Sequence, residues 1–532
     1  MVGMVQEERL EFIHIYNMKI ILNNFRNGIV NDSRDASSSV AKMLTNFDVN
    51  GFPNTLTPYR DSEDGNSNAS NDQMQTWCIA KNTSSPTTAN DYSLFGLGRQ
   101  TASDKVRIFK KNLTTGASND LDDNAWTETS NNTASANTTV NYRLFVYYPK
   151  LGMIFGAHGN RYIYEYDPDG GTAFNETDAD LTSFTTMAQG IVHSKDDILY
   201  VPYDNKIAKN DNGTWTTTAL TLPSGYYITS IAEYNDDIAI GMAPVSGSGN
   251  SKVFIWDRST TLAEVKESVD WGYGMLNVLE EIDGYLVGIS IYGNNTIAHR
   301  NKIIFRYYTG AGAKSFKELY DTGTGTQVTR LPIAKQKIGG RLHFMLSISL
   351  NGSRREGVWS FGRNENGVWT LIHERTPDND TQTENSGTGN LNGFFYVGDY
   401  LFQSFINSSS AYEVSKTNDT ASFTATSIFE STVNEGMRAE DKIKKKQLTS
   451  ISIGYKTLSA VSGQVVVKYK VDGGSYTTIC TATTTGNNVL EFNNASGVPF
   501  TFGREYEFRL ESTLGAEITN FEYDYDVIPT LS

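Results

Sequence analysis

Short apolar stretches alternate with tight polar turns through the middle of the chain, and the pattern recurs seven times between Asp91 and Phe429. In each repeat a polar turn leads into an apolar strand, and a second strand follows it. The seven turns are Asn90–Asp91, Lys150–Leu151, Asp196–Asp197, Asp236–Asp237, Asp283–Gly284, Gly339–Gly340 and Gly398–Asp399. Their spacing of roughly 40 to 60 residues suits one four-stranded blade per repeat. The pattern therefore predicts an all-β fold built around a seven-bladed β-propeller.

Two nearly identical heptads indicate an internal repeat. Residues 210–216 read Asn-Asp-Asn-Gly-Thr-Trp-Thr, and residues 364–370 read Asn-Glu-Asn-Gly-Val-Trp-Thr. Asn-Gly between two strands favours a type I′ turn, because this turn needs positive φ at both central residues. We expect both heptads to form hairpins at equivalent positions of their blades.

Three regions are expected along the chain. Residues 1–74 form an extended N-terminal arm, apolar up to Tyr59, and a polar linker. Residues 75–432 form the propeller, and a strand of the arm is a candidate to complete its last blade. Residues 433–532 form a C-terminal antiparallel β-sandwich, and we expect residues 440–532 to fold on their own. The lysine-rich stretch from Arg438 to Lys446 is interpreted as a solvated junction rather than a partner surface.

The beginning of the chain is open to two interpretations. Residues 1–17 carry Glu7, Glu8 and Glu11 and do not resemble a signal peptide. Met18 precedes a strand-like segment, so residues 1–17 are either not part of the native start or a short amphipathic lead-in.

Composition and charge exclude several classes of protein. The 29 Tyr, 26 Phe and 46 Gly suit pleated strands and turns. A net charge of −15 repels nucleic acid, so sequence-specific nucleic-acid binding is not expected. No apolar run reaches the roughly 18 residues of a membrane span. Cys78 and Cys480 are interpreted as two buried thiols in different domains.

Residues with catalytic or metal-binding chemistry are scattered. The six histidines lie in different repeats without a close pair, and they are His14, His158, His193, His299, His343 and His373. His343 is interpreted as a core histidine. The Asp196–Asp197 and Asp236–Asp237 pairs have the chemistry of glycosidase carboxylates, but their recurrence at blade turns favours a role in the turns. We predict no catalytic residues, no cofactor site and no metal site.

The heptads around Trp215 and Trp369 resemble degenerate aspartate boxes of sialidase-type propellers. They depart from the box, because Lys209 and Arg363 replace its serine or threonine and the Gly-to-Trp spacing is one residue short. In that family the box is structural. The resemblance therefore implies a fold rather than an activity.

A broader resemblance is to virion proteins of tailed bacteriophages. It is carried by the overall layout and by four short motifs, NFRNGI at 24–29, NFDVNG at 46–51, LTPY at 56–59 and VKYKVDGG at 467–474. In those families a propeller often builds the tail nozzle or hub, and an N-terminal arm holds neighbouring subunits. The resemblance implies a virion protein of the tail, made in the host cytoplasm.

These observations predict a structural component of a tailed phage particle that is not an enzyme. Its expected partners are other virion proteins and copies of itself, with a host-surface glycan as a further candidate. The alternative is a glycan-binding or sialidase-like glycoside hydrolase propeller. For that alternative, Tyr226, Tyr227, Trp271 and Tyr273 are candidate sugar-stacking residues, although aromatic residues in the core of a blade give the same pattern.

Overall fold

The computed structural model describes most of the chain, and it contains strands but no α-helix among the residues described. These residues are 16–22, 41–45, 47–48, 56–58, 63–64, 72–100, 105–116, 120–123, 126–135, 144–158, 161–170, 174–247, 249–259, 265–292, 302–320, 334–350, 353–364, 367–376, 391–406, 412–417, 426–431, 444–457, 463–493 and 500–528. The chain divides into two compact units, residues 60–422 and residues 1–59 with 423–532. The predicted all-β class is confirmed.

Consecutive four-stranded antiparallel sheets make up the unit of residues 60–422. The first three are β6 (Asp72–Lys81), β7 (Tyr92–Gln100), β8 (Lys105–Asn112) and β9 (Thr127–Ser135); β10 (Phe145–Tyr148), β11 (Met153–His158), β12 (Tyr162–Tyr166) and β13 (Phe174–Asp180); and β14 (Ile191–His193), β15 (Ile198–Tyr203), β16 (Lys206–Asp211) and β17 (Thr214–Thr221). The fourth and fifth are β18 (Tyr226–Tyr234), β19 (Asp237–Pro244), β20 (Asn250–Trp256) and β21 (Glu267–Tyr273); and β22 (Met275–Ile282), β23 (Tyr285–Tyr292), β24 (Lys302–Tyr308) and β25 (Ala313–Tyr320).

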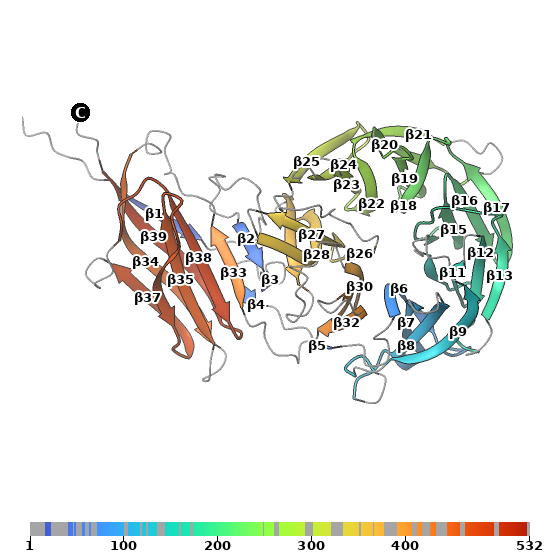
Figure 1. Cartoon of the computed structure of the whole chain (residues 1–532), viewed down its shortest axis with the longest axis horizontal. Helices are drawn as coiled ribbons and strands as arrows, with labels where there is room; N and C mark the ends of the chain where they lie inside the picture. The colour runs from blue at the N-terminus through green and yellow to red at the C-terminus, as the bar shows by residue number, and fades with distance from the viewer. Residues whose placement is uncertain are drawn as a thin grey trace, which may run out of the picture. The chain divides into compact units, whose positions relative to one another are not determined.

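The last two sheets of this unit differ in how they are assembled. The sixth is again consecutive, with β26 (Lys335–Ile338), β27 (Arg341–Leu350), β28 (Ser353–Arg363) and β29 (Trp369–Arg375). The seventh contains β30 (Leu391–Val397), β31 (Tyr400–Ile406), β32 (Tyr412–Thr417) and, from far upstream, β5 (Glu63–Asp64). Figure 1 shows the sheets around a ring, with β18, β22 and β30 toward its middle and β9, β13, β17 and β21 outside. The predicted β-propeller character is confirmed.

The strand β5 joins the two ends of this unit. Asp64 pairs with Ser415 and Glu63 pairs with Lys416. Both residues lie in the segment that the sequence analysis interprets as a polar linker. The described strand that completes the seventh sheet thus comes from the linker and not from the apolar part of the arm.

Positive backbone φ angles explain the residues found at the turns. Asn235 and Asp236 have φ of 48° and 67°, and Gly339 and Gly340 have 55° and 73°, as a type I′ turn requires. In the fourth sheet the turn is Asn235–Asp236, one residue earlier than predicted, because Asp237 already begins β19. In the first heptad Asn212 and Gly213 have φ of 50° and 88°, so its hairpin prediction is confirmed.

The second unit contains two larger antiparallel sheets and a short pair of strands. One sheet is ordered β1 (Tyr16–Leu22), β39 (Glu517–Val527), β34 (Lys446–Thr457), β37 (Gly486–Asn493). The other is ordered β2 (Ala41–Thr45), β33 (Ser427–Ser431), β38 (Tyr506–Thr513), β35 (Gln464–Val471), β36 (Thr477–Ala482). The short strands are β3 (Phe47–Asp48) and β4 (Thr57–Pro58). The ring of Phe508 lies 4.4 Å from that of Tyr523, so side chains of the two larger sheets touch.

The N-terminal arm is part of this second unit. β1 pairs with β39 over seven positions, from Tyr16↔Val527 to Leu22↔Phe521, and β2 pairs with β33. Leu56 also exchanges two backbone hydrogen bonds with Ile518, at 2.8 and 3.1 Å. β33 belongs here too, although the sequence analysis places it in the propeller at 75–432.

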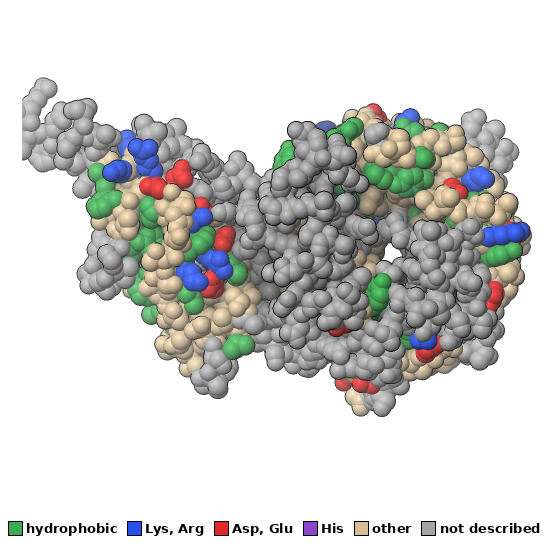
Figure 2. Space-filling view, viewed as in Figure 1, with side chains coloured by type: hydrophobic (Ala, Val, Ile, Leu, Met, Phe, Trp, Pro, Cys, Tyr) green, Lys and Arg blue, Asp and Glu red, His purple; other side chains and the backbone are tan. Residues whose placement is uncertain are grey.

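The outer face of the β35–β38 pair carries a ladder of ion pairs. Lys468 and Arg509 both contact Glu511, each at 2.7 Å, and Lys470 contacts Glu507 at 3.0 Å. Figure 2 shows Lys or Arg side chains beside Asp or Glu side chains over this part of the unit. Lys446, by contrast, is fully buried at the start of β34 and donates to the carbonyl of Arg504 at 2.6 Å. The interpretation of Arg438–Lys446 as a solvated junction is therefore wrong for Lys446, and residues 438–443 lie outside the described residues.

Among the residues described, no helix is both long and apolar enough to cross a membrane.

Candidate functional site

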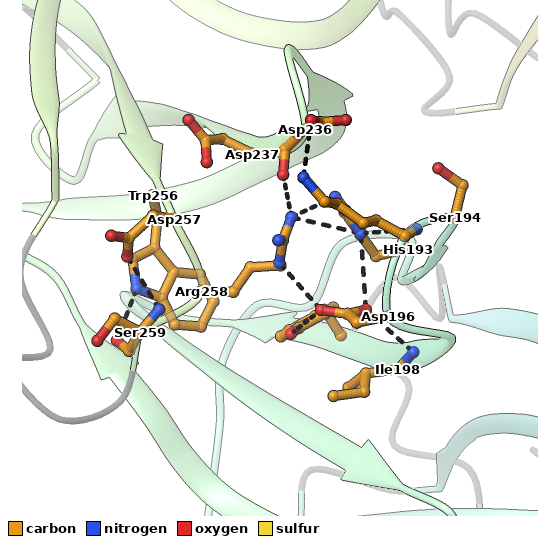
Figure 3. A network of polar contacts seen from close by, with 12 residues as sticks. His193, Ser194, Asp196, Ile198, Asp236, Asp237, Trp256, Asp257, Arg258 and Ser259 are labelled. Carbon is orange, nitrogen blue, oxygen red and sulfur yellow. Dashed lines mark hydrogen bonds and ion pairs between the residues drawn. The ribbon is translucent and has the colours of Figure 1, made fainter.

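A partly buried polar cluster joins the third and fourth sheets (Figure 3). We call His193, Asp196, Asp236 and Arg258 the Arg258 cluster. His193 ends β14, Asp196 lies in the turn that follows, and Asp236 lies in the turn between β18 and β19. Arg258 follows β20 with a φ of 68°, a backbone conformation that non-glycine residues seldom adopt. This conformation places the guanidinium between the two turns.

The guanidinium of Arg258 contacts all three other members of the cluster. Its Nε lies 2.9 Å from Asp196 Oδ2, and its Nη1 lies 2.7 Å from His193 Nε2. Nη1 also donates to the backbone carbonyl of Asp236. His193 is 1% exposed, whereas the side chains of Arg258 and Asp196 are 15% and 26% exposed. The cluster is therefore shielded from water on the histidine side and partly hydrated on the carboxylate side.

Both ring nitrogens of His193 lie close to hydrogen-bond donors. Arg258 Nη1, which can only donate, lies 2.7 Å from Nε2, and the backbone N–H of Lys195 lies 3.3 Å from Nδ1. Nδ1 is 3.6 Å from Asp196 Oδ1. Asp196 also accepts from the hydroxyl of Tyr200 at 3.0 Å and from the backbone N–H of Ile198 at 3.2 Å. Asp196 is thus held by three elements at once.

Neighbouring polar groups surround the cluster without completing a hydrolytic triad. The hydroxyl of Ser194 donates to Glu233 at 2.8 Å and does not engage His193 in the contacts observed. Lys195 contacts the carboxylate of Asp236 at 2.8 Å. In a catalytic triad an acid orients a base, and the base contacts the nucleophile. Such a triad would require a contact between Ser194 and His193. The arrangement instead fastens the turn of one sheet to the turn of the next.

The four aspartates singled out from the sequence have structural partners. Asp196 and Asp236 belong to the Arg258 cluster, and Asp237 contacts Lys266 at 2.9 Å. The carbonyl of Asp197 accepts from the hydroxyl of Tyr148 at 2.7 Å. Sequence reasoning missed Arg258, whose only sequence signal is its place directly after the Trp256–Asp257 dipeptide.

The histidines do not form a metal site among the described residues. No group of three or more His, Cys, Asp or Glu side chains suited to a metal is found there. His343 is 7% exposed and 3.7 Å from Glu374, and burial lowers its pKa, so its interpretation as a core histidine is confirmed. The prediction that the histidines lie in different repeats is wrong for His343 and His373. Both lie in the sixth sheet, on β27 and β29. His14 and His299 lie outside the described residues, as does the side chain of His158.

The tryptophans of the two heptads act in packing. Trp215 donates its indole N–H to Asp178 at 2.6 Å, and burial raises the pKa of that carboxyl. The ring of Trp369 stacks on the rings of Tyr307 and Phe361, with centroids 5.1 Å away in both cases. These contacts agree with the structural role that the aspartate-box resemblance implies.

The proposed sugar-stacking residues differ in exposure. Trp271 is fully buried, Tyr226 and Tyr227 are half-buried, and Tyr273 is 42% exposed. Trp271 is therefore a core residue and not a binding residue. Tyr273 remains available to a ligand.

Both cysteines are buried and unpaired, as predicted. Burial raises the pKa of the Cys78 thiol, and it raises that of Cys480 to about 11. Neither thiol has the lowered pKa of a reactive cysteine.

No protein-family model matches the chain, and no curated protein matches it. Solved structures similar to it include one described as a glycoside hydrolase, at 9% identity and a TM-score of 0.29, covering 85% of this chain and 98% of that one. Another is described as the Dos1 propeller, at 11% identity and a TM-score of 0.39, covering 64% and 77%. A third is a Mycobacterium tuberculosis puromycin-hydrolyzing peptidase, at 10% identity and a TM-score of 0.39, covering 65% and 51%.

These similarities correct one prediction. The sequence analysis predicts that the chain is not an enzyme, whereas two of the three similar structures are described as hydrolytic enzymes. The prediction of a non-enzyme is therefore withdrawn. At this identity and these TM-scores, the similarity assigns no activity or substrate to this chain.

Proposed function

We propose that the chain is a structural component of a tailed phage particle, in the nozzle, hub or a related part of the tail. In this proposal residues 60–422 are a seven-bladed propeller closed by β5, and residues 1–59 with 423–532 are a β-sandwich. The protein acts through its interfaces with copies of itself, other virion proteins or the host surface. The phage resemblance of the N-terminal and C-terminal motifs suggests the setting.

The observation that carries the proposal is the way distant segments close each unit. β1 pairs with β39 near the other end of the chain, and β5 pairs with β32 across more than half of the sequence. The first pairing spans seven positions and the second spans two, so backbone hydrogen bonds between distant segments must break before either unit opens. Such closure suits a part that bears force between subunits.

Contacts between neighbouring sheets support the same role. The side-chain amide of Gln189 both donates to and accepts from the backbone of Phe145, at 2.9 and 3.3 Å. Gln336 makes the same paired contact with the backbone of Tyr396, at 2.9 and 2.8 Å. Lys335 on β26 contacts Glu280 at 2.8 Å and the carbonyl of Ile231 at 2.8 Å. Different sheets of this unit are thus joined by polar contacts as well as by apolar packing.

The arm takes a different part from the one expected. The phage resemblance implies an arm that holds neighbouring subunits, whereas the described arm strands β1 and β2 pair with strands of the same chain. In the proposal, contacts with other subunits therefore fall to the loops of the propeller and to the outer faces of the sheets.

The genes on either side of the coding sequence test the proposal. Portal, terminase or tail-tube genes as neighbours would support it. Neighbours confined to polysaccharide uptake and metabolism would overturn it in favour of a carbohydrate-active protein. Sedimentation of the purified chain adds a physical test, since a tail component is expected to form a ring of defined size or to bind a co-expressed tail protein.

A further inference from the structure

Three tyrosines gather where strands of the fourth and fifth sheets end. Tyr273 ends β21, Tyr292 ends β23 and Tyr320 ends β25, while Lys302 begins β24. Tyr273 and Tyr320 are 42% and 47% exposed, which is high for large aromatic side chains. We call these three tyrosines, with Lys302 and Glu318, the tyrosine patch.

Contacts within the patch hold its members together. The rings of Tyr273 and Tyr292 are 4.6 Å apart, and Lys302 Nζ lies 6.0 Å from the ring centres of Tyr292 and Tyr320. Lys302 also forms an ion pair with Glu318 at 2.9 Å, and the hydroxyl of Tyr320 donates to the same carboxylate at 2.9 Å. The cation and the carboxylate offset each other, so the patch combines aromatic surface with polar groups and carries little net charge.

The buried side chain of Arg306 holds the backbone at Tyr273. Arg306 is 7% exposed, and it donates to the carbonyl of Tyr273 at 3.0 Å and to Ser290 Oγ at 3.3 Å. Gly272 and Gly274 flank Tyr273 with φ of 87° and 106°. A Cβ at Gly272 would lie 3.2 Å from the Arg306 guanidinium, so glycine allows this close approach. The backbone at Tyr273 is held before any ligand arrives, which lowers the entropy cost of binding.

The chemistry of the patch favours a sugar over other ligands. A stable protein interface buries about 800 Å² on each partner, far more than three tyrosine rings provide. The chain's net charge of −15 disfavours an acidic ligand. A neutral pyranose has an apolar C–H face that packs on an aromatic ring, and hydroxyls at its edge that bond with carboxylate, ammonium and phenol groups.

We propose that the tyrosine patch binds neutral carbohydrate, with a pyranose ring packed on Tyr273 or Tyr320 and its hydroxyls bonded to Glu318 and Lys302. The inference concerns this surface alone and is independent of the virion role. It holds equally for a protein of the particle that contacts a glycan-coated host and for a carbohydrate-active protein.

A glycan array probed with the full-length chain tests the inference, followed by calorimetric titration with the neutral oligosaccharide that gives the strongest signal. Tyr273→Ala and Tyr320→Ala should each weaken binding about tenfold, the size of effect expected when one aromatic packing surface is lost. Tyr320→Phe keeps the ring and should weaken binding less than Tyr320→Ala. Tyr92→Ala is the matched control, because Tyr92 is 36% exposed and belongs to the first sheet.

Three outcomes would overturn the inference. The first is that the chain binds no neutral glycan on the array, and the second is that it binds only acidic glycans. The third is that Tyr92→Ala loses as much glycan affinity as the patch variants. Thermal unfolding of each variant shows whether it is folded. Since Tyr273 and Tyr320 are exposed, we expect their variants to retain the midpoint of the unmodified chain.

Discussion

At the scale of single residues, polar side chains in this protein fasten one sheet to the next. The Arg258 cluster is a partly shielded example, in which one guanidinium contacts a carboxylate, an imidazole and a backbone carbonyl. Lys150 and Asp211 also connect neighbouring sheets, with a contact of 3.1 Å, but both side chains are more than a third exposed. The two sites therefore allow a direct comparison of a shielded and an exposed ion pair.

Arg258→Met should destabilise the unit of residues 60–422. The change leaves Asp196 and His193 without their shared donor, and we expect the free energy of unfolding to fall by about 2 kcal/mol, less than the roughly 3 to 5 kcal/mol of a fully buried pair. Urea denaturation followed by tryptophan fluorescence measures the change. Lys150→Met is the control and should leave the denaturation midpoint unchanged. Equal midpoints for the two variants would show that the cluster adds no stability.

Lys111 should make stability depend on pH above neutrality. Burial lowers its pKa to about 8, and the charge of Lys416 acts in the same direction. In the unfolded chain a lysine keeps its proton up to about pH 10.4. Between these values the unfolded state binds the extra proton, so the free energy of unfolding should rise with pH by up to about 1.4 kcal/mol per pH unit. Below pH 8 both states are protonated and this contribution does not change.

Urea denaturation at a series of pH values between 8 and 10 tests the effect of Lys111. The rise should be smaller in Lys111→Met than in the unmodified chain, and it should persist in the exposed control Lys150→Met. Parallel curves for Lys111→Met and the unmodified chain would mean that Lys111 keeps an ordinary pKa in the folded state.

At the scale of elements, local patterns predicted the strands well but not their long-range partners. Alternating apolar residues and the Asn-Gly heptad gave the strands and one hairpin, since both depend on neighbours in sequence. The pairing of Tyr16–Leu22 with Glu517–Val527 has no local signal, because it joins segments almost 500 residues apart. Asp64 similarly lies in the predicted linker, since a two-residue strand has no periodicity to detect. The Arg258 cluster also escaped detection, because its members come from two sheets.

The strand β5 can be tested with prolines. Consecutive residues of a strand direct their N–H groups to opposite sides, so of Glu63→Pro and Asp64→Pro only one removes an N–H that faces β32. That variant should lower the thermal midpoint of the unit of residues 60–422, with a loss of about 1 kcal/mol for each hydrogen bond broken. Ser67→Pro, in the same segment but outside β5, is the control. If neither proline differs from this control, β5 does not close the seventh sheet.

At the scale of the whole molecule, one of the two units takes its strands from both sides of the other in sequence. The C-terminal region therefore lacks β1, β2 and β33 when it is cut at residue 433. The sequence-based expectation that residues 440–532 fold alone changes accordingly, because this piece lacks the same three strands. Residues 1–59 and 423–532 are expected to be needed together, because without the arm the edges of β39 and β33 lose their partners.

Deleting residues 1–59 should affect one unit and spare the other. Differential scanning calorimetry of the full chain is expected to resolve two transitions, one for each unit. The deletion should lower the midpoint of the transition of the second unit (residues 1–59 with 423–532) or abolish that transition. The transition of residues 60–422 should stay in place, since β5 is retained. If the midpoint of the transition of residues 60–422 falls instead, the arm stabilises that unit and this account of the arm is wrong.

Labelling of purified particles can test the proposed place of this chain in a phage tail. An antibody raised against residues 60–422, coupled to gold and viewed by electron microscopy, should label one end of the particle at a fixed position on the tail. Mass spectrometry of the same particles should detect the chain at a constant ratio to the major tail protein. If the particles carry no label and the chain is recovered only from the particle-free lysate, the proposal is contradicted.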